Sequence, residues 1–242
     1  MLSLAPSERP SAFRLAGAAA LLAAAVVVPG AIARAQAPAP PTQSPVERLG
    51  PALVRVGNVR ADTGKKEVSI AGTINEVQTL EFIAATKGGT KNYESAIQLE
   101  TNGINLNVAL ILVGLDPARS TPPRGHLDPV PPKGDPVEVW IDWDSAQGHR
   151  HVRAEELVFN SQTKETLAEG PWVYTGSVFS KEANQFMADV EGPLIGFVHT
   201  PAALIDSPRT LTQGTYGANQ FNPNLGLKVG DHVVVTIRAL PR

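Results

Sequence analysis

Alternation of apolar and polar residues constrains the fold of this chain most strongly, and it is clearest between residues 137 and 154. Apolar side chains recur at every second position, at Val137, Val139, Ile141 and Trp143. The segment 145–148 supplies turn residues, and Val152 resumes the pattern. Because successive side chains of a strand point to opposite faces, this spacing predicts a β-hairpin with Trp143 facing the core and Trp140 facing outward.

Similar alternation predicts further strands along the chain. The expected strands cover residues 68–74, 80–84, 93–99, 172–179, 185–190, 194–198 and 232–239. A Lys-Gly-Gly-Thr break at residues 87–90 makes 80–99 a candidate for a second hairpin, with both of its strands half-buried. A chain with this many short strands is predicted to build a sheet-based core.

Helical signals are few. Asn102 offers an N-cap for an apolar run from Ile104 to Val113, which Gly114 ends, and we expect one fully buried helix there. A short second helix is predicted from Thr200 or Pro201 through Ile205. The predicted fold is therefore strand-dominated α+β, with a bent antiparallel or mixed sheet or barrel, one buried helix and a second short helix.

A long proline-rich crossing interrupts the strands between residues 116 and 136. It contains seven prolines and no hydrophobic periodicity, which predicts a structureless loop. Long loops of this kind are uncommon in a compact domain unless they cover a site or join subdomains.

The N-terminal 35 residues have the layout of a signal peptide. A weakly basic start precedes an apolar run from Leu15 to Val28, and Ala33-Arg34-Ala35 forms a small-x-small cleavage site. The apolar run is too short for a retained membrane anchor. The sequence predicts a signal peptide over 1–35, a Pro-rich linker over 36–50 and a single domain over 51–242, in a periplasmic or secreted product with no stable membrane anchor.

Composition excludes several classes of function. The chain has no cysteine, which rules out disulfides, a thiol nucleophile, cysteine-ligated clusters and lipoprotein acylation. Without residues 1–35 it carries 18 basic and 22 acidic residues, and no window concentrates Lys and Arg. Because nucleic-acid surfaces need such clusters, nucleic acid is not an expected partner, and no cofactor is expected either.

The hairpin at 137–154 places four potential metal ligands on one parity, Asp142, Asp144, His149 and His151. Converging His and Asp side chains suit zinc or manganese. The alternative is a solvated strand face on which opposite charges pair weakly across the turn. We favour the second interpretation and predict no metal.

Other constellations are incomplete. A Gly-x-Ser-x-Gly nucleophile elbow is absent, so His199 and Asp206 lack a serine partner of the usual kind. Trp140 and Trp172 could form a ligand-stacking surface, although packing in the core and at its rim is the simpler interpretation.

An ordered series of short motifs resembles the YdjY-domain family of exported bacterial proteins over residues 62–240. The matching segments are Leu80-Glu81-Phe82, Gly89 to Ser95, Ala109 to Gly114, Glu155-Glu156-Leu157 and Trp172 to Ser177. The resemblance implies a single envelope domain of unassigned activity.

The chain departs from the family pattern at two positions. Tyr93 stands where members usually have a histidine, and Ala85 where a cysteine is common. These replacements remove the ligands for a metal or redox role of the kind suspected in the family. Lys91, Glu94 and Ser95 retain the pattern, and neighbours in a strand such as Glu94 and Ser95 should face opposite ways.

Together these features predict a non-catalytic binding or accessory module that takes an envelope protein or a small-molecule ligand beneath the loop 116–136. The candidate contact residues are Lys91, Tyr93, Glu94, Ser95, Trp140, Trp172 and His199. One alternative is a hydrolase or lyase that uses Lys91, Glu94 or His199 in a cleft. Another is a structural envelope protein that docks through an exposed apolar patch near Trp140.

Overall fold

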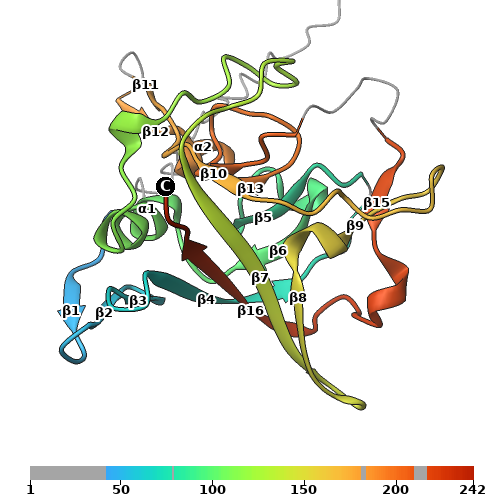
Figure 1. The fold of residues 1–242 in the computed structure, drawn as a ribbon, viewed down its shortest axis with the longest axis horizontal. Coiled ribbons are helices and arrows are strands. Elements are labelled where there is room, and N and C mark those ends of the chain that lie inside the picture. The colour runs from blue at the N-terminus through green and yellow to red at the C-terminus, as the bar shows by residue number, and fades with distance from the viewer. Residues whose placement is uncertain (1–41, 78, 181–183, 210–216) are drawn as a thin grey trace, which may run out of the picture. The chain divides into compact units, whose positions relative to one another are not determined.

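The predicted hairpin is the longest feature of the fold, as the computed structural model shows (Figure 1). Strand β7 spans Asp135–Ser145 and β8 spans Gly148–Arg153. Buried and more exposed residues alternate along β7, with Trp143 in the core and Trp140 on the outer face, as predicted. The structure describes residues 42–77, 79–180, 184–209 and 217–242, so the predicted signal peptide lies outside the described residues.

Eight strands close into a mixed barrel around the core. Their order is β4 (Glu67–Ile74), β16 (His232–Ala239), β7, β10 (Trp172–Tyr174), β14 (Ile205–Asp206), β13 (Pro193–Gly196), β5 (Phe82–Thr86) and β6 (Ser95–Leu99), with β6 pairing back to β4. The pairs β13–β14 and β5–β6 are parallel, and the other pairs in this ring are antiparallel. This arrangement confirms the predicted strand-dominated α+β class and its bent, mixed sheet.

Additional strands extend the barrel. Strands β1 (Val46–Arg48), β2 (Leu53–Val56) and β3 (Val59–Asp62) continue the sheet beyond β4, and β8 extends it beside β7. Two small ribbons lie outside it, β9 (Val158–Asn160) with β15 (Asn219–Phe221) and β11 (Phe179–Ser180) with β12 (Gln185–Phe186). Strand β1 falls within the segment assigned to the linker, so the sheet begins at Val46.

Residues 80–99 do not form the predicted hairpin. Strand β5 and β6 are parallel, with Phe82 beside Ser95, and the 3₁₀ turn η1 (Asn92–Glu94) leads into β6. Strand β5 pairs with β13 on its other side, and all five of its residues are buried. The half-buried interpretation of β5 was therefore wrong, since both its edges are paired and both its faces are buried.

The helices also differ from the prediction in part. Helix α1 (Gly103–Leu112) begins at the Asn102 cap as predicted, but Ile111 and Leu112 are exposed, so it is not fully buried. The second short helix is α2 (Met187–Glu191), within a segment predicted as a strand. No helix forms over 200–205, because Ile205 pairs with both β10 and β13.

The Pro-rich loop is ordered by specific contacts rather than structureless. It contains the 3₁₀ turn η2 (Pro117–Arg119) and an isolated bridge between Thr121 and Lys133. Ser120 Oγ donates to Thr175 O at 2.7 Å, and Leu127 N donates to His199 O at 3.0 Å. The loop is therefore fixed to the barrel along its length.

Candidate functional site

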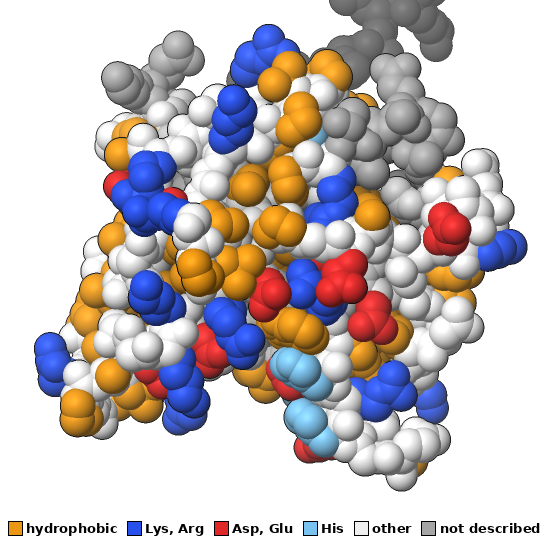
Figure 2. All heavy atoms as spheres, in the orientation of Figure 1, with side chains coloured by type: hydrophobic (Ala, Val, Ile, Leu, Met, Phe, Trp, Pro, Cys, Tyr) orange, Lys and Arg blue, Asp and Glu red, His pale blue; other side chains and the backbone are white. Residues whose placement is uncertain are grey.

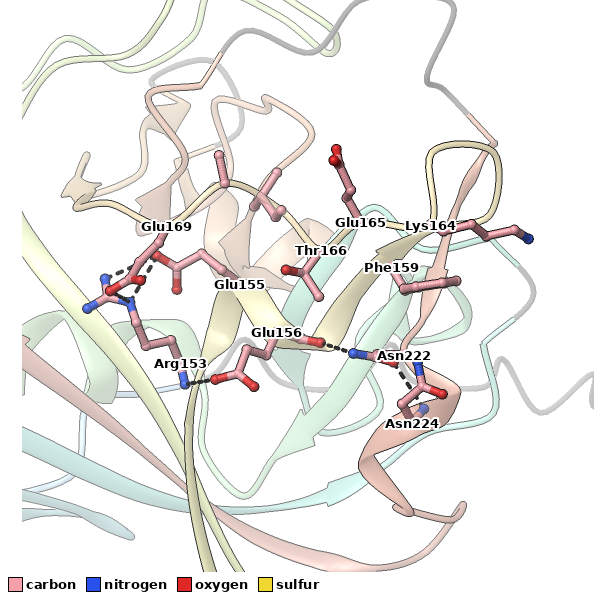
Figure 3. Close-up of a pocket in the computed structure, with 12 residues that line it drawn as sticks. Arg153, Glu155, Glu156, Phe159, Lys164, Glu165, Thr166, Glu169, Asn222 and Asn224 are labelled. Atoms are coloured by element: carbon pink, nitrogen blue, oxygen red, sulfur yellow. Dashed lines mark hydrogen bonds and ion pairs between the residues drawn. The ribbon is translucent and has the colours of Figure 1, made fainter.

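A polar groove of about 760 Å³ lies beside the end of β8 (Figure 3). Three separate segments build it: the 3₁₀ turn η3 (Ala154–Leu157) with its flanks, the stretch 164–169, and the region of the 3₁₀ turn η5 (Pro223–Leu225). The lining residues are Arg153, Glu155, Glu156, Phe159, Lys164, Glu165, Thr166, Leu167, Ala168, Glu169, Asn222 and Asn224.

Glu155 is the most deeply buried charged residue of the groove, with 2% of its surface exposed. Its Oε1 atom accepts hydrogen bonds from Arg153 Nη2 at 3.1 Å, Gly170 N at 3.2 Å and Arg209 Nη2 at 3.1 Å. Its Oε2 atom is buried and has no hydrogen-bond partner among the described residues. One half of the carboxylate is therefore saturated, and the other half is an unused acceptor.

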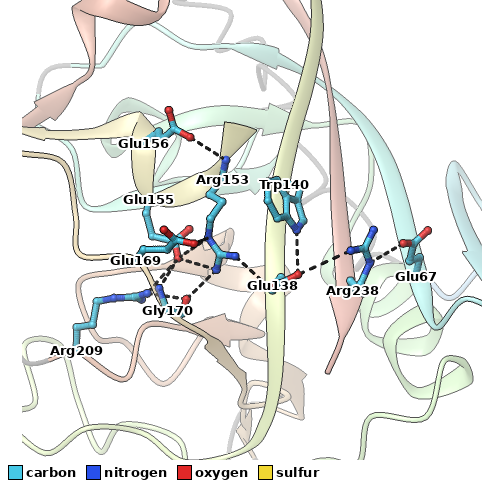
Figure 4. A network of polar contacts seen from close by, with 10 residues as sticks. All are labelled: Glu67, Glu138, Trp140, Arg153, Glu155, Glu156, Glu169, Gly170, Arg209 and Arg238. Carbon is cyan, nitrogen blue, oxygen red and sulfur yellow. Dashed lines mark hydrogen bonds and ion pairs between the residues drawn. The ribbon is translucent and has the colours of Figure 1, made fainter. Parts of the chain in front are cut away.

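A chain of ion pairs connects this carboxylate to the barrel (Figure 4). Arg153 Nη1 donates to Glu138 Oε1 at 3.0 Å, and Arg238 bonds Glu67 at 2.7 Å and lies 3.9 Å from Glu138. Burial opposes ionisation of Glu138, but hydrogen bonds from Trp140 and Arg153 outweigh it and lower the pKa of this carboxyl. This series of ion pairs holds Arg153 in one position, and Arg153 in turn holds Glu155.

Trp140 belongs to the same face but does not offer a free stacking surface. Its ring stacks on His151 with centroids 4.4 Å apart and an interplanar angle of 4°. Its Nε1 donates to Glu138 Oε2 at 3.2 Å, and the Arg153 guanidinium lies 5.1 Å from its centroid. The indole is thus engaged by the protein itself.

Trp172, the second candidate for ligand stacking, is fully buried in the barrel. The Arg209 guanidinium lies 5.3 Å from its ring centroid. This contact places Trp172 behind Arg209, where it supports a cation that bonds Glu155.

The four polar residues on the β7–β8 hairpin converge as their parity predicts. Asp142 Oδ1 lies 2.6 Å from His151 Nδ1 and 3.2 Å from His149 Nε2, and Asp144 lies 3.1 Å from His149 Nδ1. The hydrogen bond to Asp144, followed by that to Asp142, raises the pKa of His149. Among the described residues no group of three or more His, Asp or Glu side chains could hold a metal. Figure 2 shows this cluster on the exposed face over β7 and β8.

The residues matching the family pattern in η1 and β6 serve local structure. Lys91 Nζ pairs with Glu94 Oε2 at 2.8 Å, which raises the pKa of Lys91. Tyr93 is half exposed, and Lys91 Nζ lies 5.9 Å from its ring centroid. Ser95 is fully buried and its Oγ donates to Lys91 O at 2.8 Å. Glu94 and Ser95 therefore do not act on a common atom.

His199 is buried beneath the Pro-rich loop, with 4% of its surface exposed. Its Nδ1 lies 2.7 Å from Asp128 O and its Nε2 lies 2.9 Å from Ser207 O. Asp206 lies 3.9 Å from Nε2, and burial raises the pKa of Asp206 well above its usual value. Both ring nitrogens of His199 are occupied by carbonyl oxygens, so the ring ties the loop to the barrel.

A second polar pair, Glu81 and His126, was not among the predicted site residues. The buried Glu81 Oε2 lies 3.0 Å from Nε2 of His126, whose side chain is 46% exposed. Glu81 N donates to Glu94 O at 2.9 Å, which sets this pair beside η1. The sequence signal was a glutamate between apolar residues in the Leu80-Glu81-Phe82 motif. His126 comes from the Pro-rich loop, where no periodicity marks it.

The groove was missed for a similar reason, although Glu155 and Glu156 stand in one of the family motifs. Its first two segments, 153–159 and 164–169, are close in sequence, but the third lies more than fifty residues further on. The pairing of β9 with β15 brings Asn222 toward η3. Asn222 Nδ2 donates to Glu156 O at 2.8 Å, which fixes that contact.

The fold and its sites define a closed, mixed β-barrel domain with a polar groove on its outer side. The YdjY domain matches residues 59–238, and the chain belongs to this family. No curated protein and no solved structure matches it. Within the described residues, no helix is long and apolar enough to cross a membrane.

Proposed function

We propose that this chain is exported to the bacterial envelope and acts there as a non-catalytic binding module whose ligand occupies the groove around Glu155. The buried, unpartnered Oε2 atom of Glu155 carries the proposal. A buried acceptor without a hydrogen bond costs roughly 1–3 kcal/mol. A ligand that donates to this atom recovers that free energy, so the groove favours an occupied state.

The composition of the groove favours binding over catalysis. Its titratable lining consists of Glu, Lys and Arg side chains, and neither a hydroxyl–imidazole pair nor another activated nucleophile lies among these lining residues. Phe159 and Leu167 add apolar surface next to the polar groups, which is the mixture found in small-molecule sites.

Native mass spectrometry of the chain purified from the periplasm tests the proposal. We expect a retained small mass that disappears on denaturation and is absent from the Ala168→Trp variant, which fills the groove. Ala146→Trp, an equally bulky change at the exposed β7–β8 turn, is the matched control and should retain the mass. A bare wild-type chain, or a mass that persists in Ala168→Trp, would contradict the proposal.

Export has its own test. The sequence predicts that chain recovered from the periplasm begins at Gln36, so its intact mass should lack residues 1–35. An uncleaved chain in the cytoplasmic fraction would contradict export without affecting the groove.

A second candidate function is acid–base catalysis at Glu81 and His126. A buried carboxylate that orients a solvent-exposed imidazole is the arrangement of a general base and its positioning group. If this pair is catalytic, hydrolysis of 4-nitrophenyl acetate should fall at least tenfold in His126→Ala. His232→Ala, at an exposed strand position, should leave the rate unchanged.

The docking alternative receives less support. The surroundings of Trp140 are the ion pairs of Glu138, Arg153 and Arg238 rather than a contiguous apolar patch. Figure 2 shows charged and apolar side chains interspersed on this face.

A further inference from the structure

The chemistry of the groove narrows the class of ligand, and this inference rests on the binding function proposed above. Glu155 Oε2 accepts hydrogen bonds only, so its partner must be a donor. The orientation of the carboxylate is fixed, because three residues, Arg153, Gly170 and Arg209, donate hydrogen bonds to Oε1. A buried acceptor with a fixed orientation favours ligand groups that carry hydrogen-bond donors.

Charge in the groove favours a cationic donor over a neutral one. The lining holds four carboxylates, Glu155, Glu156, Glu165 and Glu169, against two cations, Arg153 and Lys164. Arg153 is already committed to Glu138, Glu155 and the carbonyl of Gly170. Lys164 points away from Glu155 in Figure 3. Arg153 Nε also lies 3.5 Å from Glu169 Oε1, and Arg209 bonds Glu155 from outside the lining. With Arg209 counted, four carboxylates face three cations, so the groove keeps one net negative charge.

Arg209 is a further cation beside Glu155, and its donors are also already bonded to protein acceptors. Arg209, which is not part of the groove lining, bonds Glu155 Oε1 at 3.1 Å, Gly170 O at 2.7 Å and Ser207 Oγ at 3.1 Å. Burial lowers the pKa of this guanidinium. Both arginines thus bond to Oε1, and neither has a bond to Oε2.

The single free oxygen also decides between cationic groups. A guanidinium binds best as a planar fork on two carboxylate oxygens, and Oε1 of Glu155 is already saturated. An ammonium is a compact charge with three separate donors, so it can use one carboxylate oxygen and neighbouring neutral acceptors. Thr166 lines the same groove and offers such an acceptor.

The geometry points to a primary ammonium group as the feature that this groove recognises, with Glu155 Oε2 as its main acceptor. Phe159, Leu167 and Ala168 line the groove beside the polar atoms and supply a surface for the alkyl chain that bears the amine. The ligand class is accordingly a small amine or an amine-bearing side chain or terminus.

Three probes of equal length separate the head groups: 1-pentylamine, pentylguanidine and 1-pentanol. They are titrated into the isotopically labelled chain, and binding is followed by NMR at the Gly170 amide, which donates to Glu155 Oε1. We expect pentylamine to bind at least tenfold more tightly than either other probe. Equal or tighter binding of pentanol or pentylguanidine overturns the ammonium assignment and leaves the groove as a binding site.

A matched pair of variants distinguishes a hydrogen bond to Glu155 from attraction to the overall negative charge of the groove. Glu155→Gln and Glu165→Gln each remove one negative charge from the lining, but Glu165 is exposed and Glu155 is buried. We expect Glu155→Gln to weaken pentylamine at least tenfold and Glu165→Gln less than threefold. Equal losses overturn the role of Oε2.

Two controls keep the outcomes distinct. A thermal melt checks that Glu155→Gln folds, and if it does not, the head-group comparison on the unaltered chain decides alone. The ligand retained from the periplasm tests the binding function separately. A retained neutral or anionic ligand supports the groove as a site and contradicts the ammonium class.

Discussion

At the scale of single residues, two Gly-Asp pairs show that one dipeptide can serve two physical purposes. Gly134 precedes β7 and Gly230 precedes β16, in segments of similar sequence. A Cβ atom on Gly134 would overlap the backbone oxygen of Tyr174. Gly230 has φ +88 and open space around it. The first glycine is needed for a close backbone approach and the second for a left-handed turn.

This difference predicts unequal costs for the same substitution. Gly134→Ala should destabilise the fold by about 3 kcal/mol or more, because backbone atoms, unlike a side-chain end, cannot rotate away. Gly230→Ala should cost only about 1–2 kcal/mol, the penalty for an L-residue in the left-handed region. Urea unfolding of both variants measures the two free energies, and equal losses would show that the strand spacing at Tyr174 is looser than the structure has it.

At the scale of elements, Asp135 joins the Pro-rich loop, the start of β7 and the C-terminus. Its carboxylate bonds Arg119 Nη2 at 2.5 Å, Asp116 N at 2.9 Å and Arg242 Nε at 3.0 Å. The hydrogen bonds from Arg119 outweigh the effect of burial and lower the pKa of Asp135 to about 2. A loop rich in proline is thereby anchored by charge rather than by a regular strand.

This anchor predicts a pH-dependent stability. A carboxyl whose pKa falls on folding stabilises the folded state above its unfolded pKa, and the contribution is lost as pH falls through the folded value. For Asp135 this amounts to about 2 kcal/mol at neutral pH. Asp135→Asn should therefore be less stable than wild type by at least that amount at pH 7, and the gap should shrink between pH 5 and pH 2.

Urea unfolding across this pH range measures the gap. Glu76→Gln removes the same charge from an exposed side chain that makes no ion pair among the described residues, and it should leave both the stability and its pH dependence nearly unchanged. A gap for Asp135→Asn that stays constant down to pH 2 would contradict the assigned role.

Elements defined by local pattern were predictable, and those defined by distant partners were not. The β7–β8 hairpin has its pattern, its turn and its partner within one segment, so alternation was sufficient. Strand β5 lies inside the sheet rather than at its edge because it pairs with β13, more than a hundred residues away. Helix α2 follows a period-two pattern but is held as a helix beside α1, where Asp189 accepts a hydrogen bond from Gly103 N at 2.6 Å.

The candidate site shows the same limit. Parity correctly placed Asp142 on the same face as the two histidines, and Trp140 on the outer face. Parity could not reveal that His151 stacks on the indole of Trp140 and that Arg153 lies over it. It also could not reveal that Arg209 bonds Glu155, because these contacts depend on the closed barrel.

At the scale of the whole molecule, the barrel closes where β4 meets β6, and Gly72 lies in this pairing. A Cβ atom there would lie 2.7 Å from Ile97 Cγ2 and 2.9 Å from the backbone oxygen of Gln98. The pairing of Gly72 with Leu99 is part of the register that joins the first and last strands of the ring. Without that join the sheet would be open, and β6 would lose one of its two neighbours.

Closure therefore predicts a global effect of a small change. Gly72→Ala should lower the free energy of unfolding by about 1–3 kcal/mol, since an added methyl group in a packed interior forces neighbouring atoms apart. Ala71→Val adds more volume at the next residue, but that residue is exposed on the outer face and should cost little. Because all eight barrel strands depend on this join, Gly72→Ala should shift one cooperative transition seen alike by tryptophan fluorescence and far-ultraviolet circular dichroism. Two separate transitions in wild type would instead show that β4 and β6 close the barrel weakly.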